Sequence, residues 1–227
     1  MDLSGRAGRY GIFVVGLLNA ALGISLITHA GMGTSPITSP AYVLSLLFPL
    51  SLGVFTFLIN STMFLAQIAI SNEPFEKGQL LQLPATFLFS AFIDLFTFLL
   101  RYFPVSSYSS RMLALLPGCV VLGFGVALEV LADVLILPGE GLVKVISKRF
   151  CKDFGTVKTL FDLSLVCIAC LIALAGMGKP AGIGAGTLVA AMTVGSFSRF
   201  FKAHLAPLLG RQASCREGKT AVSHTSL

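Results

Sequence analysis

The chain has 227 residues, of which 55% are hydrophobic and only 11% are charged, and its formal net charge is +6. Its mean hydropathy is +0.89. Soluble domains carry roughly a quarter charged residues, and a core that hid this much apolar surface would need a longer chain, so a water-soluble globular protein is excluded. The basic residues lie between apolar segments and not on an aromatic-interleaved face, which excludes a nucleic-acid-binding surface.

Several apolar segments are long enough to cross a bilayer, which takes about 20 helical residues. In chain order, they cover residues 10–28, 52–70, 84–103, 112–130, 157–177 and 187–201. The last is short, and we expect it to begin in the glycine-rich stretch 182–186. The sequence therefore predicts an all-α membrane protein with about six transmembrane helices.

A further apolar segment separates the first two spans, and another separates the fourth and fifth. Both are too apolar for a solvated loop, and each contains a proline, Pro36 or Pro138, that suits the first turn of a helix. Ser35 is a suitable N-cap for a helix that begins at Pro36. Each segment could re-enter the membrane within the bundle, or lie in the membrane interface, and the sequence leaves both readings open.

The second half of the chain repeats the first at a constant offset of 102 positions. The offset pairs Arg9 with Arg111, Gly16 with Gly118, Gly23 with Gly125, Pro36 with Pro138, and Asn60 with Asp162. Matches between leucines are common by chance, but glycines, a proline and an arginine at one offset are not. We predict two three-helix repeats, residues 1–103 and 104–202, and a disordered tail over 203–227.

An odd number of spans in each repeat makes the second repeat enter the membrane from the opposite side, as in many secondary transporters. The charges agree with this topology. With the N-terminus in the cytoplasm, only Arg101, Arg111 and Lys179 of the 16 basic residues fall on the outer side. By the positive-inside rule, we expect both termini to be cytoplasmic.

Re-entrant segments would bring two helix N-termini together near the middle of the membrane. Their free N–H groups and partial positive charge suit an anion or a carboxylate. The predicted substrate-binding residues are Gly33, Thr34, Ser35, Pro36, Asn60, Pro138, Gly139, Glu140 and Asp162. For Asp162 the alternative is an ion pair with Lys158, four positions earlier on the same helix face.

Two further acidic residues lie within predicted spans, where a charge is costly and therefore suggests a function. Asp94 and Glu129 have no oppositely charged residue close in sequence. Either could couple transport to a proton or another ion, or could make satisfied hydrogen bonds between helices. His29, His204 and His224 lack metal-ligand spacing, and no nucleophile–base pair is visible, so we expect no metal, no cofactor and no enzyme activity.

Several short motifs resemble the YczE/YyaS/YitT group of small bacterial membrane proteins. They are the stretches 22–25 and 31–36, 137–143, 154–158 with 161–162, and 184–188. The likeness extends over about residues 10–201, although this group usually has more polar residues where this chain has 182–186. The resemblance implies the bacterial inner (plasma) membrane, a multi-pass topology and a transporter-like architecture.

The first functional hypothesis is a secondary transporter of a small anionic or zwitterionic solute that works by alternating access, with the lipid bilayer and the solute as partners. The alternative is a non-transporting membrane partner, such as a scaffold, a regulator or a substrate-capture subunit of a larger complex. Its docking surfaces would be the basic stretches 144–152 and 211–219. A passive channel is a third reading, and the sequence leaves a homodimer open.

Overall fold

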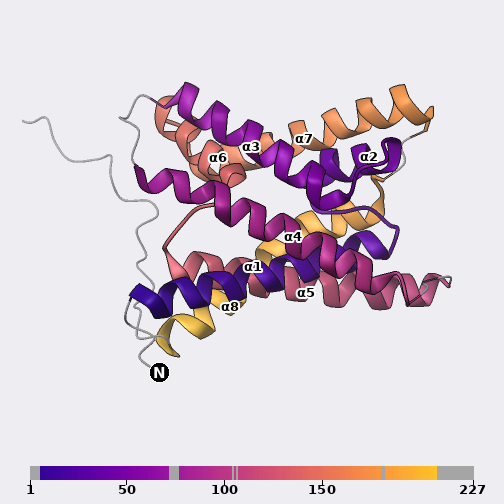
Figure 1. Cartoon of the computed structure of the whole chain (residues 1–227), viewed down its shortest axis with the longest axis horizontal. Coiled ribbons are helices and arrows are strands. Elements are labelled where there is room, and N and C mark those ends of the chain that lie inside the picture. Colours follow the sequence, from indigo (N-terminus) through magenta and orange to yellow (C-terminus); the bar gives the residue numbers. More distant parts are fainter. Residues whose placement is uncertain (1–5, 72–76, 104, 106, 180–181, 209–227) are drawn as a thin grey trace, which may run out of the picture.

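The computed structural model describes residues 6–71, 77–103, 105, 107–179 and 182–208. Within these ranges every regular element is helical, so the predicted all-α class is confirmed (Figure 1). The elements are α1 (Arg6–His29), α2 (Ser39–Leu47), α3 (Leu52–Ile70), the short 3-10 helix η1 (Lys77–Leu81), α4 (Gln82–Leu100), α5 (Tyr108–Ala132), α6 (Pro138–Arg149), α7 (Phe154–Met177) and α8 (Ala185–Leu208).

Five helices in the described part of the chain are long and apolar enough to cross a membrane: α1, α3, α4 with its preceding turn, α5 and α7. The predicted sixth span corresponds to α8, which is 24 residues long but is not among these five. Its apolar residues are interrupted by serines, threonines, Arg199 and Lys202. It begins inside the glycine-rich stretch, as expected, and runs past the predicted boundary at 202, while residues 209–227 lie outside the described residues.

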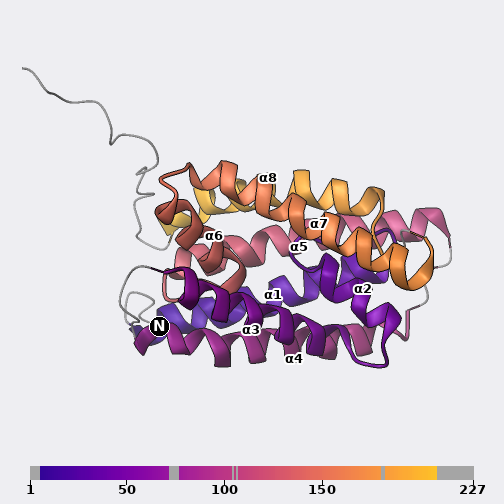
Figure 2. The same cartoon turned by 90° about the horizontal axis from the view of Figure 1, so that it is seen from above.

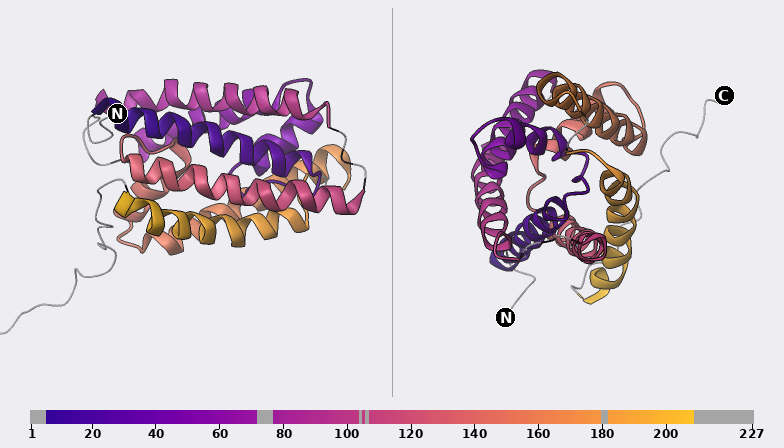
Figure 3. Two further views of the ribbon diagram at one scale, coloured as in Figure 1. Left: turned by 90° about the horizontal axis from the view of Figure 1, so that it is seen from below. Right: turned by 90° about the vertical axis from the view of Figure 1, so that its right-hand side faces the viewer.

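The long helices run along a common axis, and α2 and α6 lie at opposite ends of the bundle (Figures 1 and 2). Seen along that axis, the helices form a ring around an interior that the short segments enter (Figure 3). The main helix pairs are α1 with α5, α5 with α8, α1 with α4, and α3 with α4. We call the two ends of the bundle the α2 end and the α6 end.

The order long, short, long, long occurs twice along the chain. Helices α1 and α5 begin at residues 6 and 108, and α3 and α7 begin at residues 52 and 154, so both pairs are separated by 102 positions. This is the offset at which the sequence repeats. Each short helix therefore occupies the same place in its half of the chain.

Helices α1 and α5 approach closely because glycines on each helix lie against the backbone of the other. A Cβ added at Gly23 would lie 2.5 Å from the backbone N of Leu122, and one added at Gly125 would lie 2.4 Å from the backbone N of Ala20. Small residues at such contacts allow backbones to approach and are typical of helix pairs in membranes. This contact forms one wall of the bundle.

The α6 end of this helix pair is fixed by a polar contact. The guanidinium of Arg9 donates to the backbone oxygen of Ala132 at 3.0 Å, and it also contacts the backbone and the carboxylate of Asp133. Asp133 is left-handed, with φ 47°, and ends α5. A cation at the C-terminus of a helix is favoured by the helix dipole.

The close contact at Gly23 predicts that a single added methyl group has a large effect on stability. Gly23→Ala should lower the free energy of unfolding by roughly 1–3 kcal/mol, because the new Cβ meets backbone that cannot move aside. Thermal unfolding of the detergent-purified protein measures this. Gly11→Ala is the matched control, since a Cβ there meets nothing within 4 Å, and it should leave stability unchanged or slightly higher. Equal stability of the two variants would contradict the packing described.

Candidate functional site

A cavity of about 410 Å³, which we call the central cavity, lies where both short helices begin. Its volume is in the lower part of the range of ligand pockets, about 300–1,000 Å³. Helices from both halves of the chain contribute to its wall. The polar and charged residues that line it are Ser35, Thr38, Asn60, Glu129, Glu140, Lys158, Thr159, Asp162 and Ser198.

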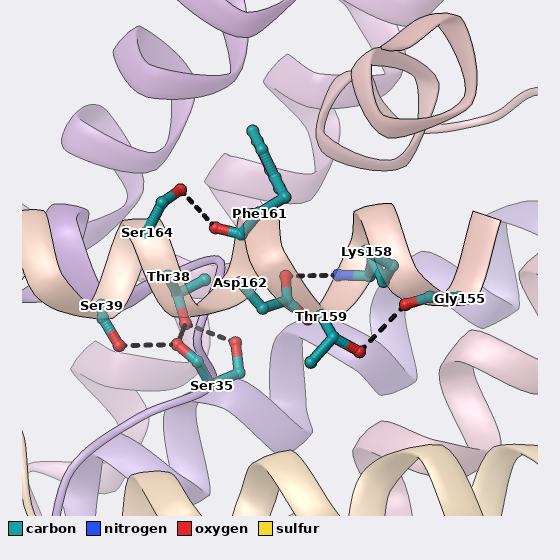
Figure 4. A network of polar contacts seen from close by, with 9 residues as sticks. All are labelled: Ser35, Thr38, Ser39, Gly155, Lys158, Thr159, Phe161, Asp162 and Ser164. Carbon is teal, nitrogen blue, oxygen red and sulfur yellow. Dashed lines mark hydrogen bonds and ion pairs between the residues drawn. The ribbon is translucent and has the colours of Figure 1, made fainter. Parts of the chain in front are cut away.

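The first wall of the central cavity is the turn that precedes α2. The backbone N–H of Thr38 donates to the oxygen of Ser35 at 3.1 Å, and that of Ser39 donates to Pro36 at 3.2 Å. The side-chain hydroxyl of Thr38 lies 2.7 Å from that of Ser35 (Figure 4). It also lies 2.9 Å from the hydroxyl of Thr34. This end of α2 therefore presents a cluster of hydroxyl groups.

The predicted start of this helix at Pro36 is wrong, and the hydroxyl cluster gives the reason. The side chains and backbone of residues 35–38 close a tight turn, so helical geometry begins only at Ser39. The proline in the first helical turn is Pro40 instead of Pro36. Proline suits that position because its missing N–H would have no partner there.

The second wall is the first turn of α6, which begins at Pro138 as predicted. The first helical hydrogen bond runs from the N–H of Gly141 to the oxygen of Leu137, at 2.8 Å. The N–H groups of Gly139 and Glu140 precede it, so no carbonyl of the helix can accept from them. Both residues line the central cavity, and Pro138 is buried beside them. This wall thus has the partial positive charge of a helix N-terminus.

Three carboxyl groups and one ammonium group share the central cavity. Lys158 Nζ lies 2.6 Å from Asp162 Oδ1 on α7, so the ion pair expected as the alternative for Asp162 is present (Figure 4). Glu140 interacts electrostatically with both of these residues and with Glu129. The Oε1 atom of Glu129 is buried and has no hydrogen-bond partner within the described part of the chain.

The structure therefore brings together most of the residues that the sequence singles out. Those on the wall of the central cavity are Ser35, Pro36, Asn60, Glu129, Gly139, Glu140 and Asp162. Thr38 and Ser198 also line it and were not predicted. For Thr38 a signal exists, since a hydroxyl residue three positions after Ser35 can close a turn. For Ser198 the sequence offers none.

Gly33, Thr34 and Asp94 lie elsewhere. The backbone N–H of Thr34 donates to the hydroxyl of Thr187 at 3.2 Å, so this part of the chain packs on the start of α8. Asp94 accepts hydrogen bonds from the hydroxyl of Ser51 at 2.6 Å and from the N–H of Gly53 at 2.8 Å. It thus caps the N-terminus of α3, as in the alternative of satisfied hydrogen bonds between helices.

Within the described residues, no three His, Cys, Asp or Glu side chains are grouped so that they could hold a metal ion. The fold and the central cavity define a helical membrane protein with a polar site enclosed by both halves of the chain. The chain belongs to the family of unknown function DUF6198, whose sequence model matches residues 7–203.

Similar proteins confirm the resemblance to the YczE/YyaS group. The chain is 29% identical to the uncharacterized membrane protein YczE of Bacillus subtilis (strain 168) over 194 residues, which cover 85% of this chain and 84% of YczE. It is 28% identical to the uncharacterized protein YyaS of the same strain over 177 residues, 78% of this chain and 84% of YyaS. An uncharacterized Haemophilus influenzae protein is 26% identical over 190 residues, 84% of this chain and 80% of its own length. No solved structure matches significantly.

The ion pair between Lys158 and Asp162 predicts that a second substitution restores part of the stability lost through a first. Lys158→Met should destabilise the protein because it leaves the Asp162 carboxylate without its partner beside Glu140. Adding Asp162→Asn should recover part of the loss, with a coupling energy of roughly 0.5–3 kcal/mol in thermal unfolding. Lys152→Met removes an exposed lysine close by in sequence and should change nothing. A double variant no more stable than Lys158→Met would contradict the pairing.

Proposed function

We propose that the protein is a secondary transporter of a small zwitterionic solute that works by alternating access. The observation on which this rests is the central cavity, where two short helices begin and then run to opposite ends of the bundle. In transporters with inverted repeats, solutes bind near the middle of the membrane at the ends of such interrupted helices. Non-helical backbone at that depth is tolerated where it lines a cavity.

The paths of α2 and α6 support two inverted repeats with re-entrant helices. Near the end of α2, Leu47 packs on Gly176 at the end of α7. At the end of α6, Arg149 donates a hydrogen bond of 2.7 Å to the backbone oxygen of Ile70, the last residue of α3, at the α6 end of the bundle. Each short helix thus starts at the central cavity and returns to the end of the bundle from which its segment entered.

The charges of the central cavity favour a zwitterion over a free anion, which the sequence alone also allowed. Three carboxyl groups face a single ammonium group, so a solute carrying only negative charge would meet net repulsion. An ammonium group is suited to the carboxyl group of Glu140. A carboxylate is suited to the N–H groups at the start of α6 and to the hydroxyls of Ser35 and Thr38.

Glu129 is the proposed coupling residue. A buried carboxyl oxygen without a hydrogen-bond partner is costly when ionised, so the Glu129 carboxyl group should bind a proton. Taking up a proton together with the solute would couple transport to the proton gradient. Asp94, the other candidate, already has two hydrogen-bond donors and lies outside the central cavity.

The proposed location is the bacterial inner membrane, with the α6 end in the cytoplasm. Arg9, Lys144, Lys148 and Arg149 all belong to the α6 end, whereas Arg101 and Arg111 lie where α4 ends and α5 begins, at the α2 end. This distribution agrees with the positive-inside rule.

The purified protein in proteoliposomes tests the proposal directly. A panel of radiolabelled amino acids and small betaines, with inorganic anions and dicarboxylates beside it, should give counterflow exchange with at least one zwitterion and with no simple anion. Absence of exchange with every member of the panel, from protein that stays folded, would reject the transporter. Exchange with anions alone would reject the solute class.

The hydroxyl cluster supplies a variant for the same assay. Thr38→Val keeps the shape of the side chain and removes its hydroxyl, so the half-saturating solute concentration should rise about tenfold, the effect of one lost hydrogen bond. Ser45→Ala is the matched control, because the Ser45 hydroxyl donates to the backbone oxygen of Tyr42 within α2 and lies outside the central cavity. Equal half-saturating solute concentrations for the two variants would show that Thr38 does not contribute to solute binding.

The two candidate coupling residues can be separated by their neutral variants. Glu129→Gln should abolish accumulation driven by a proton gradient and keep solute exchange at equal concentrations, because exchange needs no net proton movement. Asp94→Asn should still be driven by the gradient, whatever its effect on stability. Accumulation by Glu129→Gln at the level of the unmodified protein would contradict the assignment.

A further inference from the structure

A second cavity, of about 460 Å³, lies at the α6 end of the bundle. We call it the α6-end cavity. Its wall comes from the C-terminal half of α3, the start of α4, the chain between α5 and α6, and α6 itself. Gln67, Gln82, Val134, Gly141 and Lys144 are among the residues that line it. Neither Gln67 nor Gln82 belongs to a motif that the sequence analysis singles out.

The α6-end cavity lies beyond the central cavity along one face of α3. Asn60 lines the central cavity and Gln67 lines the α6-end cavity. Seven residues are two helical turns, so both side chains project from the same face, about 10 Å apart along the helix. Met63 lies between them on α3 and packs with Leu142 and Leu165 in an apolar cluster. An apolar barrier thus separates two polar spaces.

The two glutamines are built unlike ordinary core residues. Gln67 and Gln82 are only 5% and 6% exposed, and the Oε1 atom of each has no hydrogen-bond partner within the described part of the chain. A buried carbonyl without a partner costs free energy, and native structures contain few of them. A Cβ added at Gly141 would lie 2.4 Å from Gln67 Oε1, so Gly141 leaves the room that this amide occupies. Both glutamines line the α6-end cavity, and their carboxamide oxygens need a polar partner.

The equivalent place at the α2 end is closed. The offset of 102 pairs Gln67 with Ala169, which is fully buried in an apolar cluster with Val43 and Ala173 where α2 packs on α7. It pairs Gln82 with Gly184, where a Cβ would lie 2.6 Å from the backbone oxygen of Met32. The chain is thus packed tightly at the α2 end and open to a polar cavity at the α6 end.

A hydrogen bond reinforces this difference. At the α2 end the N–H of Gly186 donates to the oxygen of Met32 at 2.9 Å and ties the chain before α2 to the start of α8. The counterpart of Met32 is Val134, which lines the α6-end cavity. Within the described residues, no backbone hydrogen bond of this kind joins Val134 to the start of α4.

We propose that the α6-end cavity is the cytoplasmic vestibule of the central cavity and a second binding station for its solute. The carboxamides of Gln67 and Gln82 accept hydrogen bonds from the ammonium group, Lys144 attracts the carboxylate, and Met63 is the barrier that the solute passes. This inference rests on the proposed transport function. It also assigns the structure to a state that is closed at the α2 end.

Cysteine accessibility tests the vestibule without a known solute. Gln67→Cys, Gln82→Cys, Ala169→Cys and Lys144→Cys are each made in the full chain, and a charged, membrane-impermeant thiol reagent is applied to inside-out vesicles or to spheroplasts. Peptide mapping separates the new thiol from the native cysteines. Residues 67 and 82 should react from the cytoplasmic face only, residue 144 should react there as the exposed control, and residue 169 should react from neither face.

Absence of reaction at both 67 and 82 while 144 reacts would overturn the vestibule, and so would reaction from the outer face. Reaction at 169 from outside would overturn the closed α2 end. Two positions are used so that one variant that fails to fold, as judged by gel filtration, still leaves a result.

Transport separates this inference from the function on which it rests. Gln67→Leu combined with Gln82→Leu should slow exchange about tenfold or more and leave equilibrium binding of the radiolabelled zwitterion to the central cavity unchanged. Asn19→Leu is the control, because Asn19 donates within its own helix to the backbone oxygen of Val15 and lines neither cavity. Unchanged exchange in the double variant would overturn the second station. A chain that labels as expected but exchanges no member of the panel would instead overturn the proposed transport function.

Discussion

The structure depends on one constraint: backbone that leaves helical geometry inside an apolar bundle must find hydrogen-bond partners or a polar space. The chain does so twice, in the segments that lead into α2 and α6. Hydroxyl side chains satisfy the first break, where Ser35 and Thr38 close a turn. The second break has no such side chains, and a proline removes one N–H while two others face the central cavity. The polar site follows from satisfying these two interruptions at one place.

The rest of the bundle fixes that place. Helices α1 and α5 are in backbone contact at their glycines, and Arg9 links them by a hydrogen bond at the α6 end. Contacts of this kind admit little movement, because packed backbone cannot yield as a long side chain can. Helices α2 and α6 pack instead against α3 and α7 and take no part in the contact between α1 and α5. Movement between the two halves is therefore expected at the short helices, while the α1–α5 wall stays in place.

How far the sequence predicts this arrangement depends on the range of the interactions. The repeat at offset 102 predicts the element order and pairs Asn60 with Asp162, and local proline chemistry predicts the start of α6. The start of α2 differs because a hydroxyl turn competes with the helix. The partners of Asp94 lie 41 and 43 positions away and carry no charge, so no local pattern could reveal that it caps α3. Thr34 likewise meets Thr187, 153 positions away.

The packing that stabilises the bundle also positions the carboxyl group on which coupling is proposed to depend. A Cβ added at Gly16 would lie 2.9 Å from Cγ of Glu129 and 3.0 Å from the backbone oxygen of Gly125. Glu129 therefore lies against bare backbone of α1, and this contact limits the directions its side chain can take. Its Oε1 atom is buried inside the protein, where the ionised carboxylate is costly and the group therefore favours binding a proton. Because Gly16 has no side chain, Glu129 can lie in this buried position against α1. A substitution at Gly16 would therefore change both the packing of the two helices and the position of the proposed coupling residue.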